Sequence, residues 1–416
     1  MTTDAHRAIN AVFRLESPKL IASLTRIVRD VGVAEELAQD ALVAALEQWP
    51  RDGVPEAPGA WLMTVAKRRA IDTLRRRDAY AGKLALFTRD AEDPATGEPD
   101  LDDHIGDDLL RLIFTAAHPV LSAEAQAALI LRMLCGLSTP EIARAYLVPE
   151  ATAAQRIVRA KRTLADAGVR FEMPTPAETA ERLAAVLRIV YLIFNEGYAA
   201  TGGDDWTRPE LCRDAMRLGR VLSGLLPAEA EVHGLVALME LQASRLPART
   251  GPDGEPVLLP DQDRRRWDRA LIRHGLAALA AAEEHGGGPY TLQAAIAACH
   301  ARAARAEDTD WPRIAALYEV LAHLQPTPVV LLNRAVAVGF AGDPGRGLRL
   351  ADELVEVRAL RAYPQLPAVR AELLARLGRP GDARAEFLRA ADLTRNAGER
   401  ALFTRRADEI AAPRGA

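Results

Sequence analysis

Apolar residues recur at helical spacing through most of the chain. The pattern covers residues 8–78, interrupted only at 50–59 by a stretch that carries Pro and Gly, and it returns at 109–172. From 179 to 416 nearly every segment has the helical pattern, with Gly and Pro at the breaks. We therefore predict an all-α fold without strands. It comprises two small helical domains and a C-terminal helical-repeat domain.

The segment between the two small domains, residues 79–108, has a different composition. Its stretch 90–108 contains many carboxylates, Pro and Gly, and no Lys or Arg. Such a stretch cannot bury an apolar core. We expect an acidic, solvated linker.

Two stretches of the C-terminal part resemble each other. Residues 333–350 and 370–388 both have the pattern of helix, Gly-Asp turn and helix, offset by 39 residues from Gly342 to Gly381. Helical hairpins of this period are tetratricopeptide-like, and the alternative is an irregular helical bundle. A repeat array leaves a concave surface. That surface would bind another protein or the chain's own N-terminal domains.

The segment 60–78 forms a basic amphipathic helix on a helical wheel. One face holds Trp61, Arg68, Asp72 and Arg75, and the opposite face holds Leu62, Ala66, Ala70 and Leu74. Dense arginine at one helix end repels itself unless phosphates neutralise it, which favours contact with nucleic acid. The alternative is a solvated face on which Asp72 bridges the two arginines.

The segment 138–168 predicts a helix-turn-helix. Its first helix ends near Tyr146, residues 147–149 form a turn, and the second helix begins at Glu150. On the second helix the polar face holds Thr152, Gln155, Arg156, Arg159 and Thr163, and the other face holds Ile157, Ala160 and Leu164. These polar side chains can hydrogen-bond base edges or phosphates in a major groove. An ordinary helical hairpin with a charged outer face is the alternative.

Composition limits the remaining function classes. The three cysteines lie far apart and form no C-x-x-C pair, so we expect neither a disulfide framework nor a zinc site. The N-terminus has no apolar signal region, and the longest aliphatic run, 189–194, is too short to span a bilayer. We expect a cytoplasmic protein with no membrane contact. A net charge of −4 averages over basic and acidic parts, so local charge matters more.

Polar clusters of the C-terminal part do not indicate catalysis. Residues 261–263 read as an acidic cap before a helix, and 195–198 as a helix end with Gly at the cap. Cys299 and His300 suggest a metal or nucleophile, but a packed helix face is favoured because no third ligand is near. The sequence has no nucleotide-binding loop and no G-x-S-x-G. We expect no enzyme activity, no catalytic residue, no metal and no cofactor.

Three runs of the first part carry a family resemblance. VGVAEELAQDALVAALEQWP, PGAWLMTVAKRRAIDTLRR and LSAEAQAALILRMLCGLSTPEIARAYLVPEATAAQRIVRAKRTL resemble an extracytoplasmic-function (ECF) sigma factor of the sigma-70 family, with regions two and four and no region three. They cover about 40 per cent of the chain. The rest resembles the long extension of one ECF subgroup, in FNEGYAAT, LPDQDRRRWDRALI and GPYTLQAAIAACHARAARAEDTDWPRIAALYE.

The resemblance implies a function and its partners. Region two would span 8–78 and region four 109–172, and the extension 179–416. Such a protein binds core RNA polymerase, through its beta-prime and beta subunits, and directs initiation at promoter DNA. The extension would regulate or support activity, through a protein regulator or an intramolecular contact. The alternative is a stand-alone helix-turn-helix regulator with a protein-binding repeat domain.

The resemblance also implies three sets of site residues. The core-polymerase-binding set is Glu36, Leu37, Gln39, Asp40 and Leu42. The set for the minus-ten element is Trp61, Lys67, Arg68, Arg69, Arg75 and Arg76. The set for the minus-35 element is Thr152, Gln155, Arg156, Arg159, Lys161 and Arg162. Two questions stay open: whether Trp61 stacks on a base or belongs to the core, and whether the linker threads the RNA channel of polymerase or is an inert tether.

Overall fold

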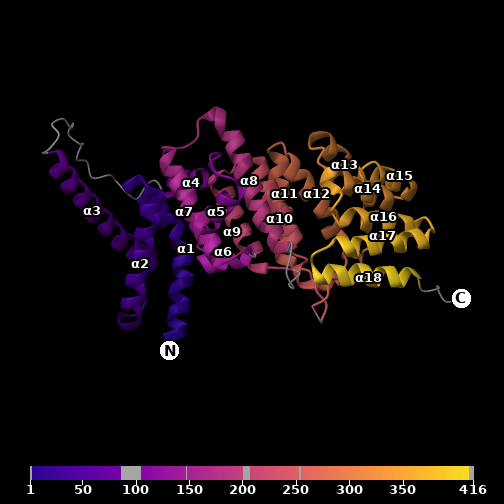
Figure 1. Ribbon diagram of the computed structural model, residues 1–416, viewed down its shortest axis with the longest axis horizontal. Helices are drawn as coiled ribbons and strands as arrows, with labels where there is room; N and C mark the ends of the chain where they lie inside the picture. The colour runs from indigo at the N-terminus through magenta and orange to yellow at the C-terminus, as the bar shows by residue number, and fades with distance from the viewer. Residues whose placement is uncertain (1, 86–104, 147, 200–206, 253, 412–416) are drawn as a thin grey trace. The chain divides into compact units, whose positions relative to one another are not determined.

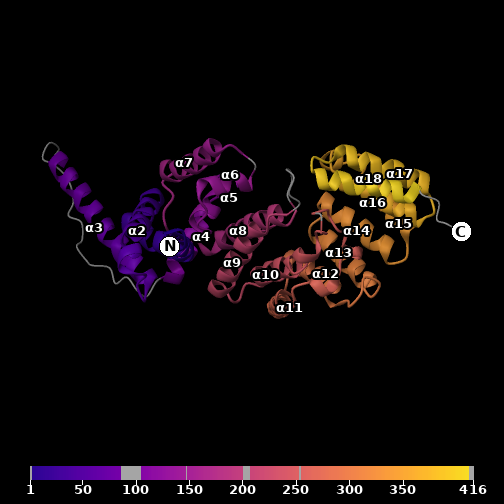
Figure 2. The same cartoon turned by 90° about the horizontal axis from the view of Figure 1, so that it is seen from below.

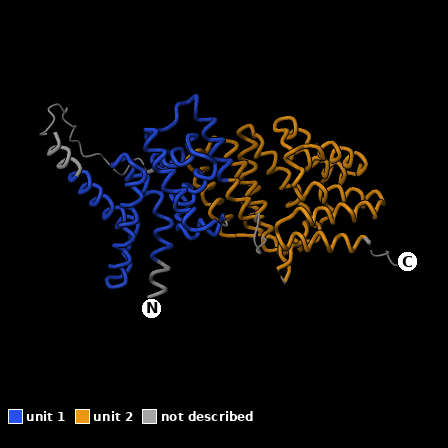
Figure 3. Tube along the Cα trace, in the orientation of Figure 1, with its two compact units in different colours: residues 1–190 blue, residues 191–416 orange. Residues whose placement is uncertain are grey.

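The protein is helical throughout the part that the structure describes. The computed structural model describes all residues except 1, 86–104, 147, 200–206, 253 and 412–416. These residues form 18 α-helices and four short 3₁₀ helices, and no strand. The predicted all-α fold is therefore confirmed for the described residues. The chain divides into two compact units, Met1–Val190 and Tyr191–Ala416 (Figure 3).

The first unit contains the helices of the two predicted small domains (Figure 1). Its helices are α1 (Thr2–Val28), α2 (Val31–Asp52), α3 (Pro58–Ala85), α4 (Ile105–Ala116), α5 (Ala123–Met133), α6 (Thr139–Ala145), α7 (Glu150–Asp166) and the first part of α8 (Pro176–Tyr198). Helix α1 packs on α2, α3 and α4, and α7 packs on α5 and α6. The cores are aliphatic, with Leu24 of α1, Ile113 of α4 and Ile130 of α5 fully buried. Burial of these faces holds the helices together.

The segment between the two domains differs from the prediction at both ends. Helix α3 continues to Ala85, and α4 begins at Ile105, so residues 105–108 are helical rather than linker. Asp108 is 1% exposed, because Arg26 and Arg111 form ion pairs with it. The expected linker residues 86–104 lie outside the described residues. The predicted start of the extension, residue 179, lies inside α8.

The second unit is a succession of helices in chain order (Figures 1 and 2). After the end of α8 its α-helices are α9 (Pro209–Leu225), α10 (Ala230–Ala243), α11 (Arg269–Glu284), α12 (Pro289–Arg302), α13 (Trp311–Leu324), α14 (Pro328–Phe340), α15 (Pro344–Asp352), α16 (Gln365–Arg376), α17 (Pro380–Leu393) and α18 (Ala397–Ala411). The 3₁₀ helices are η1 (Leu246–Ala248), η2 (Leu259–Asp261), η3 (Arg264–Arg266) and η4 (Arg358–Leu360). From α12 onward each helix packs on the next one, as in a helical-repeat array.

The repeat exists, but its predicted register is wrong. The turn before α15 contains Gly342 at φ +116°, and the turn before α17 contains Gly378 at φ +70°. Pro344 and Pro380 begin the two following helices, so the structural offset is 36 residues. Gly381 lies inside α17, where Asp382 in the first turn favours the helix N-terminus. The Gly-Asp pair therefore marks a turn in one hairpin and a helix start in the other.

Two polar motifs of the second unit have structural roles. Asp263 accepts a hydrogen bond from the backbone of Arg265 in the short η3, and Asp268 caps the longer α11. Of the predicted acidic cap at 261–263, Asp263 therefore caps a single 3₁₀ turn, and Asp261 ends η2. Helix α8 continues through Gly197 to Tyr198, so this glycine is not its cap. A Cβ at Gly197 would lie 2.7 Å from the backbone nitrogen of Cys212 on α9. The glycine permits this close helix contact.

Chemistry-bearing side chains of the fold are mostly packed. All three cysteines are free and buried, and burial raises the pKa of Cys212 to about 12. The ring of His300 packs edge-on against Trp311 at 5.3 Å, as the packed-face reading predicts. Within the described ranges, no three His, Cys, Asp or Glu side chains gather where a metal could bind. Every helix of the described part is too short or too polar to cross a bilayer.

Candidate nucleic-acid interface

Helix α3 buries one face and exposes its arginines. Leu62, Ala66 and Ala70 are at most 1% exposed, because they pack against α1 and α2. The side chains of Arg68, Arg75 and Arg76 are exposed, and Lys67 and Arg69 are half-buried. The helical wheel therefore predicted the orientation of α3. Because its apolar face is already buried, the guanidinium groups are held outward on a rigid helix.

Within the described part of α3, one arginine forms an ion pair with the neighbouring helix. Arg69 forms an ion pair with Asp40 of α2 at 3.5 Å, and both side chains are at least 40% exposed. Asp72 is exposed and forms no ion pair with Arg68 or Arg75 among the described residues. Pairs in water contribute little stability. The basic face of α3 is thus available to a polyanion.

The environment of Trp61 is compatible with both roles that the sequence left open, a core residue and a residue that stacks on a base. Its ring packs edge-to-face on Trp49 of α2, with 5.3 Å between centroids and 67° between planes. Trp49 is 4% exposed, whereas Trp61 is half-buried. Such a ring contributes to packing and keeps part of its surface in water.

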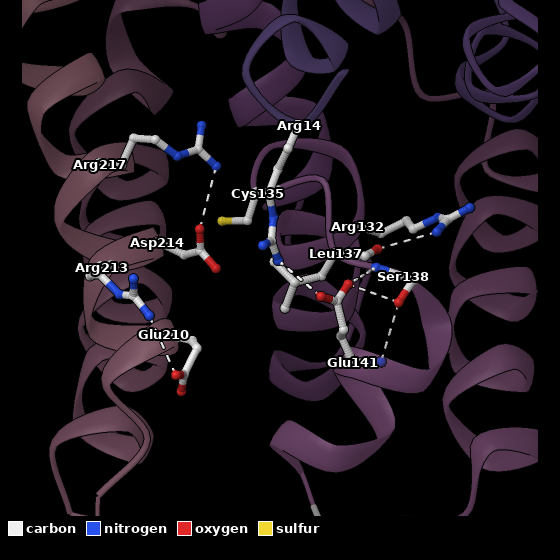
Figure 4. Close-up of polar contacts among 10 residues, drawn as sticks. All are labelled: Arg14, Arg132, Cys135, Leu137, Ser138, Glu141, Glu210, Arg213, Asp214 and Arg217. Atoms are coloured by element: carbon white, nitrogen blue, oxygen red, sulfur yellow. Dashed lines mark hydrogen bonds and ion pairs between the residues drawn. The ribbon is translucent and has the colours of Figure 1, made fainter. Parts of the chain in front are cut away.

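The helix-turn-helix is formed by α6 and α7 as the sequence predicts. Helix α6 ends at Ala145 with Tyr146 as its C-cap, and α7 begins at Glu150. Ser138 and Glu141 form a capping box at the start of α6, which fixes where the first helix begins (Figure 4). Residue 147 of the expected turn lies outside the described residues.

Helix α7 presents a polar face beside a buried apolar one. Its buried residues are Ala153, Ile157, Ala160 and Leu164. Gln155, Arg159 and Arg162 are exposed, and Thr152, Arg156 and Lys161 are half-buried. Arg156 and Arg159 line a shallow hollow of about 380 Å³ beside Glu124. The predicted division between the two faces is therefore present.

Lys161 points to a carboxylate of the other domain. Glu35 of α2 is 3% exposed and forms ion pairs with Lys161 and with Arg132 of α5, whose Nε donates to it at 2.6 Å. Arg132 also donates to the carbonyl of Leu137 at 3.2 Å, next to the capping box (Figure 4). One buried acid of the first domain thus engages two cations of the second.

Two arginines of α1 make further contacts between the same domains. Arg26 of α1 forms an ion pair with Asp108 of α4 at 2.9 Å. Arg14 of α1 donates through Nε to the carbonyl of Cys135 at 3.3 Å and pairs with Glu141 at 3.4 Å (Figure 4). The figure also draws two pairs within α9, Glu210 with Arg213 and Asp214 with Arg217. Buried and half-buried ion pairs therefore connect the two small domains.

The residues of α2 that the resemblance assigns to polymerase differ in exposure. Glu36 and Asp40 are exposed, and Gln39 and Leu42 are half-buried. Leu37 is 6% exposed and belongs to the core, because it lies on the same stripe as Ala34, Ala38 and Ala41. Glu36 and Asp40, four residues apart, share one outward face. A protein partner can reach that face directly.

Sequence reasoning missed the ion pairs between the domains. Glu35 follows the buried Ala34 and precedes the buried Ala38 by three residues, so its position on the buried stripe of α2 was a readable signal. A buried carboxylate requires a cation. Nothing in the sequence indicates that the cations are Arg132 and Lys161, which lie 97 and 126 residues further along the chain.

Comparison with known proteins gives three separate family matches. Residues 12–80 match Sigma-70 region 2, and residues 111–164 match Sigma-70, region 4. Residues 182–283 match a family of unknown function, DUF6596. The first match runs from within α1 to within α3 and the second from within α4 to within α7, so they include the helices that carry the basic faces.

Individual relatives extend these matches. The chain is 46% identical over 400 residues to an uncharacterized protein of Rhizobium meliloti (strain 1021), covering 95% of this chain and 94% of that protein. It is 33% identical over 149 residues to the ECF RNA polymerase sigma factor SigL of Mycobacterium tuberculosis, covering 35% of this chain and 81% of SigL. The RNA polymerase sigma factor CarQ of Myxococcus xanthus is 31% identical over 143 residues, covering 33% of this chain and 76% of CarQ.

Proposed function

Because the chain belongs to the ECF sigma factors of the sigma-70 family, we propose that α2 binds core RNA polymerase and that α3 and α7 read the promoter. The observation that carries this proposal is the polar face of α7. Its Gln155 and Arg159 are exposed, whereas Ile157 and Leu164 are buried beneath them. A helix held in this way can enter a major groove with its polar side chains forward.

In this proposal the two basic helices have different tasks. Gln155, Arg156 and Arg159 contact bases of the minus-35 element, and Arg162 contacts a flanking phosphate. Arg68, Arg75 and Arg76 of α3 contact the backbone near the minus-ten element. Trp61 has enough free ring surface to stack on an unpaired base. Glu36 and Asp40 of α2 are the acids that polymerase contacts first.

Run-off transcription with purified core polymerase tests the proposal. The full chain is expected to start transcripts from a discrete class in a promoter library. The double variant Arg156→Ala, Arg159→Ala is expected to lose promoter-specific initiation while its binding to core polymerase is unchanged. Arg170→Ala serves as a matched control, because Arg170 is 82% exposed and lies beyond α7. Equal loss of initiation and core binding would mean that these arginines only hold the domain together.

We assign the second unit a supporting or regulating role in initiation. Its helical-repeat architecture suits binding to a protein, either polymerase or a regulator. Chains ending at residues 172 and 198 are to be compared with the full chain. The longer truncation keeps all of α8, whose Leu183, Val186 and Leu187 are buried. Both truncations are expected to lose activity. Undiminished transcription from the 198-residue chain would show that initiation does not depend on the second unit.

The alternative of a stand-alone regulator is not favoured. Such a protein needs α6 and α7 but has no use for the region that matches Sigma-70 region 2. It would bind its operator without polymerase. The proposed partners, core polymerase and promoter DNA, place the protein in the cytoplasm and require no cofactor and no catalysis by this chain.

A further inference from the structure

The second unit contains a cavity of about 750 Å³ that the sigma function does not use. Residues from distant parts of the chain line it, from Leu259 at η2 through Trp311 of α13 to Phe403 of α18. Two of the sequence runs of the extension contribute to its lining. LPDQDRRRWDRALI contributes Arg264, and GPYTLQAAIAACHARAARAEDTDWPRIAALYE contributes His300 and Trp311. A volume of this size is typical of small-molecule sites, which span roughly 300–1,000 Å³.

One wall of the cavity is a continuous row of flat groups. The His300 ring packs edge-on against Trp311 at 5.3 Å, and Trp311 lies 4.6 Å from Phe340. The guanidinium of Arg376 covers Phe340 at 3.6 Å from the ring centre. Trp311 and Phe340 remain half-buried, so part of their ring surface faces the cavity. A planar aromatic group would find stacking partners along this wall.

The imidazole of His300 adds no positive charge to the wall. Burial, with smaller effects from Arg245 and Arg264, lowers the pKa of His300 to about 3. The ring is therefore neutral at physiological pH and behaves as a flat, weakly polar surface. The positive charge of the cavity comes from arginines alone.

Three guanidinium groups line the cavity, and one of them, Arg264, forms no ion pair among the described residues. Arg264 is 8% exposed and donates to the carbonyls of His300 and Ala303, and its Nε has no hydrogen-bond partner in the described part of the chain. Arg376 pairs with Glu372 at 3.6 Å, and Arg406 pairs with Glu372 at 2.9 Å and with Glu409 at 3.2 Å.

Two further carboxylates, Asp261 and Glu307, also line the cavity, but both are exposed. Water and salt screen exposed charges more strongly than buried ones. The interior of the cavity therefore favours a negative group, although its formal charges are balanced.

We propose that this cavity binds a small aromatic organic anion, whose ring stacks on Trp311 and whose charged group pairs with Arg376, the guanidinium that covers Phe340. This site would give the extension a small-molecule ligand. The binding claim does not depend on the sigma function, because it concerns the second unit alone.

Fluorescence titration of the full chain with two related probes tests the proposal. The anion 8-anilinonaphthalene-1-sulfonate and the neutral N-phenyl-1-naphthylamine share the same ring system and differ by the sulfonate. We expect one saturable sulfonate site per chain, with the neutral probe about tenfold weaker, as expected for a charge-assisted contact. Equal affinity for the two probes, or no saturable site, would overturn the proposal.

Variants locate the site. Arg376→Gln is expected to reduce sulfonate affinity about tenfold and to leave the neutral probe unchanged, since only the charged contact is removed. Arg384→Gln is the matched control, because Arg384 is exposed on α17 and does not line the cavity. Val336→Trp fills the cavity and is expected to weaken both probes, with thermal unfolding as the check on folding. If Val336→Trp does not fold, the comparison of Arg376→Gln with Arg384→Gln still tests the proposal. Equal effects of these two variants on sulfonate affinity would contradict it.

Discussion

The basic faces of α3 and α7 have similar composition and different surroundings. Arg68 and Arg75 of α3 are exposed without an ion pair among the described residues, so nothing has to be displaced before they meet a phosphate. Lys161 of α7 is held by the buried Glu35, which also binds Arg132. A phosphate must replace that carboxylate. The ion pair with the neighbouring domain, rather than residue type, therefore distinguishes Lys161 from the exposed arginines of α3.

The largest expected effect comes from removing the shared carboxylate. Glu35→Gln leaves Arg132 and Lys161 without their buried partner, which costs about 3 kcal/mol of stability. Native-state hydrogen exchange of α2 and α7 peptides should become faster. The freed Lys161 should also raise non-specific DNA binding, which would make α7 resemble α3. Glu36→Gln is the control, because Glu36 is exposed, and an equal effect of both variants would contradict the role of the buried acid.

The next largest expected effect is a difference in DNA binding between variants of α7 and variants of α3. Arg159→Ala on α7 is expected to cost about 1–3 kcal/mol at specific promoters and to relax base preference. Arg75→Ala on α3 is expected to weaken binding on all sequences and to reduce the salt dependence by about one phosphate contact. Filter binding at several salt concentrations, on promoter and random duplexes, measures both. Identical salt slopes and specificity ratios for the two variants would remove the distinction.

A smaller effect depends on pH and centres on Glu141 of α6. Burial would raise the pKa of Glu141, but hydrogen bonds from Ser138 and the nearby Arg14 and Arg144 outweigh it, so the folded pKa lies below its usual value. The stability from this carboxylate is therefore present above its unfolded pKa and is lost as pH falls through the folded value. Loss of such a cap costs about 1 kcal/mol.

The comparison of Glu141→Gln with the parent measures this effect. Unfolding free energies between pH 6 and pH 3 should show a difference that shrinks as the pH falls, since protonation removes the charge in the parent as well. Glu150→Gln, at the exposed start of α7, is the control. A difference that persists unchanged at pH 3 would show that the charge of Glu141 is not responsible.

The sequence predicted elements that depend on local pattern. The buried residues Leu62, Ala66 and Ala70 of α3, the limits of the helix-turn-helix and the buried residues of α7 follow from the 3.6-residue period, and the structure confirms them. Leu74, also predicted on the buried face of α3, is half-buried. The repeat offset was wrong, because a Gly-Asp pair fits both a turn and a helix start. Only the backbone at Gly342 and Gly378 distinguishes the two.

Contacts between distant segments were not predictable in the same way. The partners of Glu35 are cations that α5 and α7 bring to α2, and Asp108 is buried where Arg26 lies opposite it. Likewise, the cavity of the second unit needs α13, α14 and α16 side by side. Composition made residues 105–108 look like linker, although two arginines compensate the buried charge of Asp108.

The smallest expected effect on stability is at the exposed pair between α3 and α2. Asp40→Asn removes the partner of Arg69, but both side chains are at least 40% exposed, so stability should change by less than about 0.5 kcal/mol. If Asp40 contacts polymerase, core binding should nevertheless fall, because its carboxylate lies on the outward face of α2 with Glu36. Sedimentation of the full chain with core polymerase and thermal unfolding measure the two quantities separately. A large loss of stability would mean that α3 is held as firmly as α7, and the contrast between the two helices would then fail.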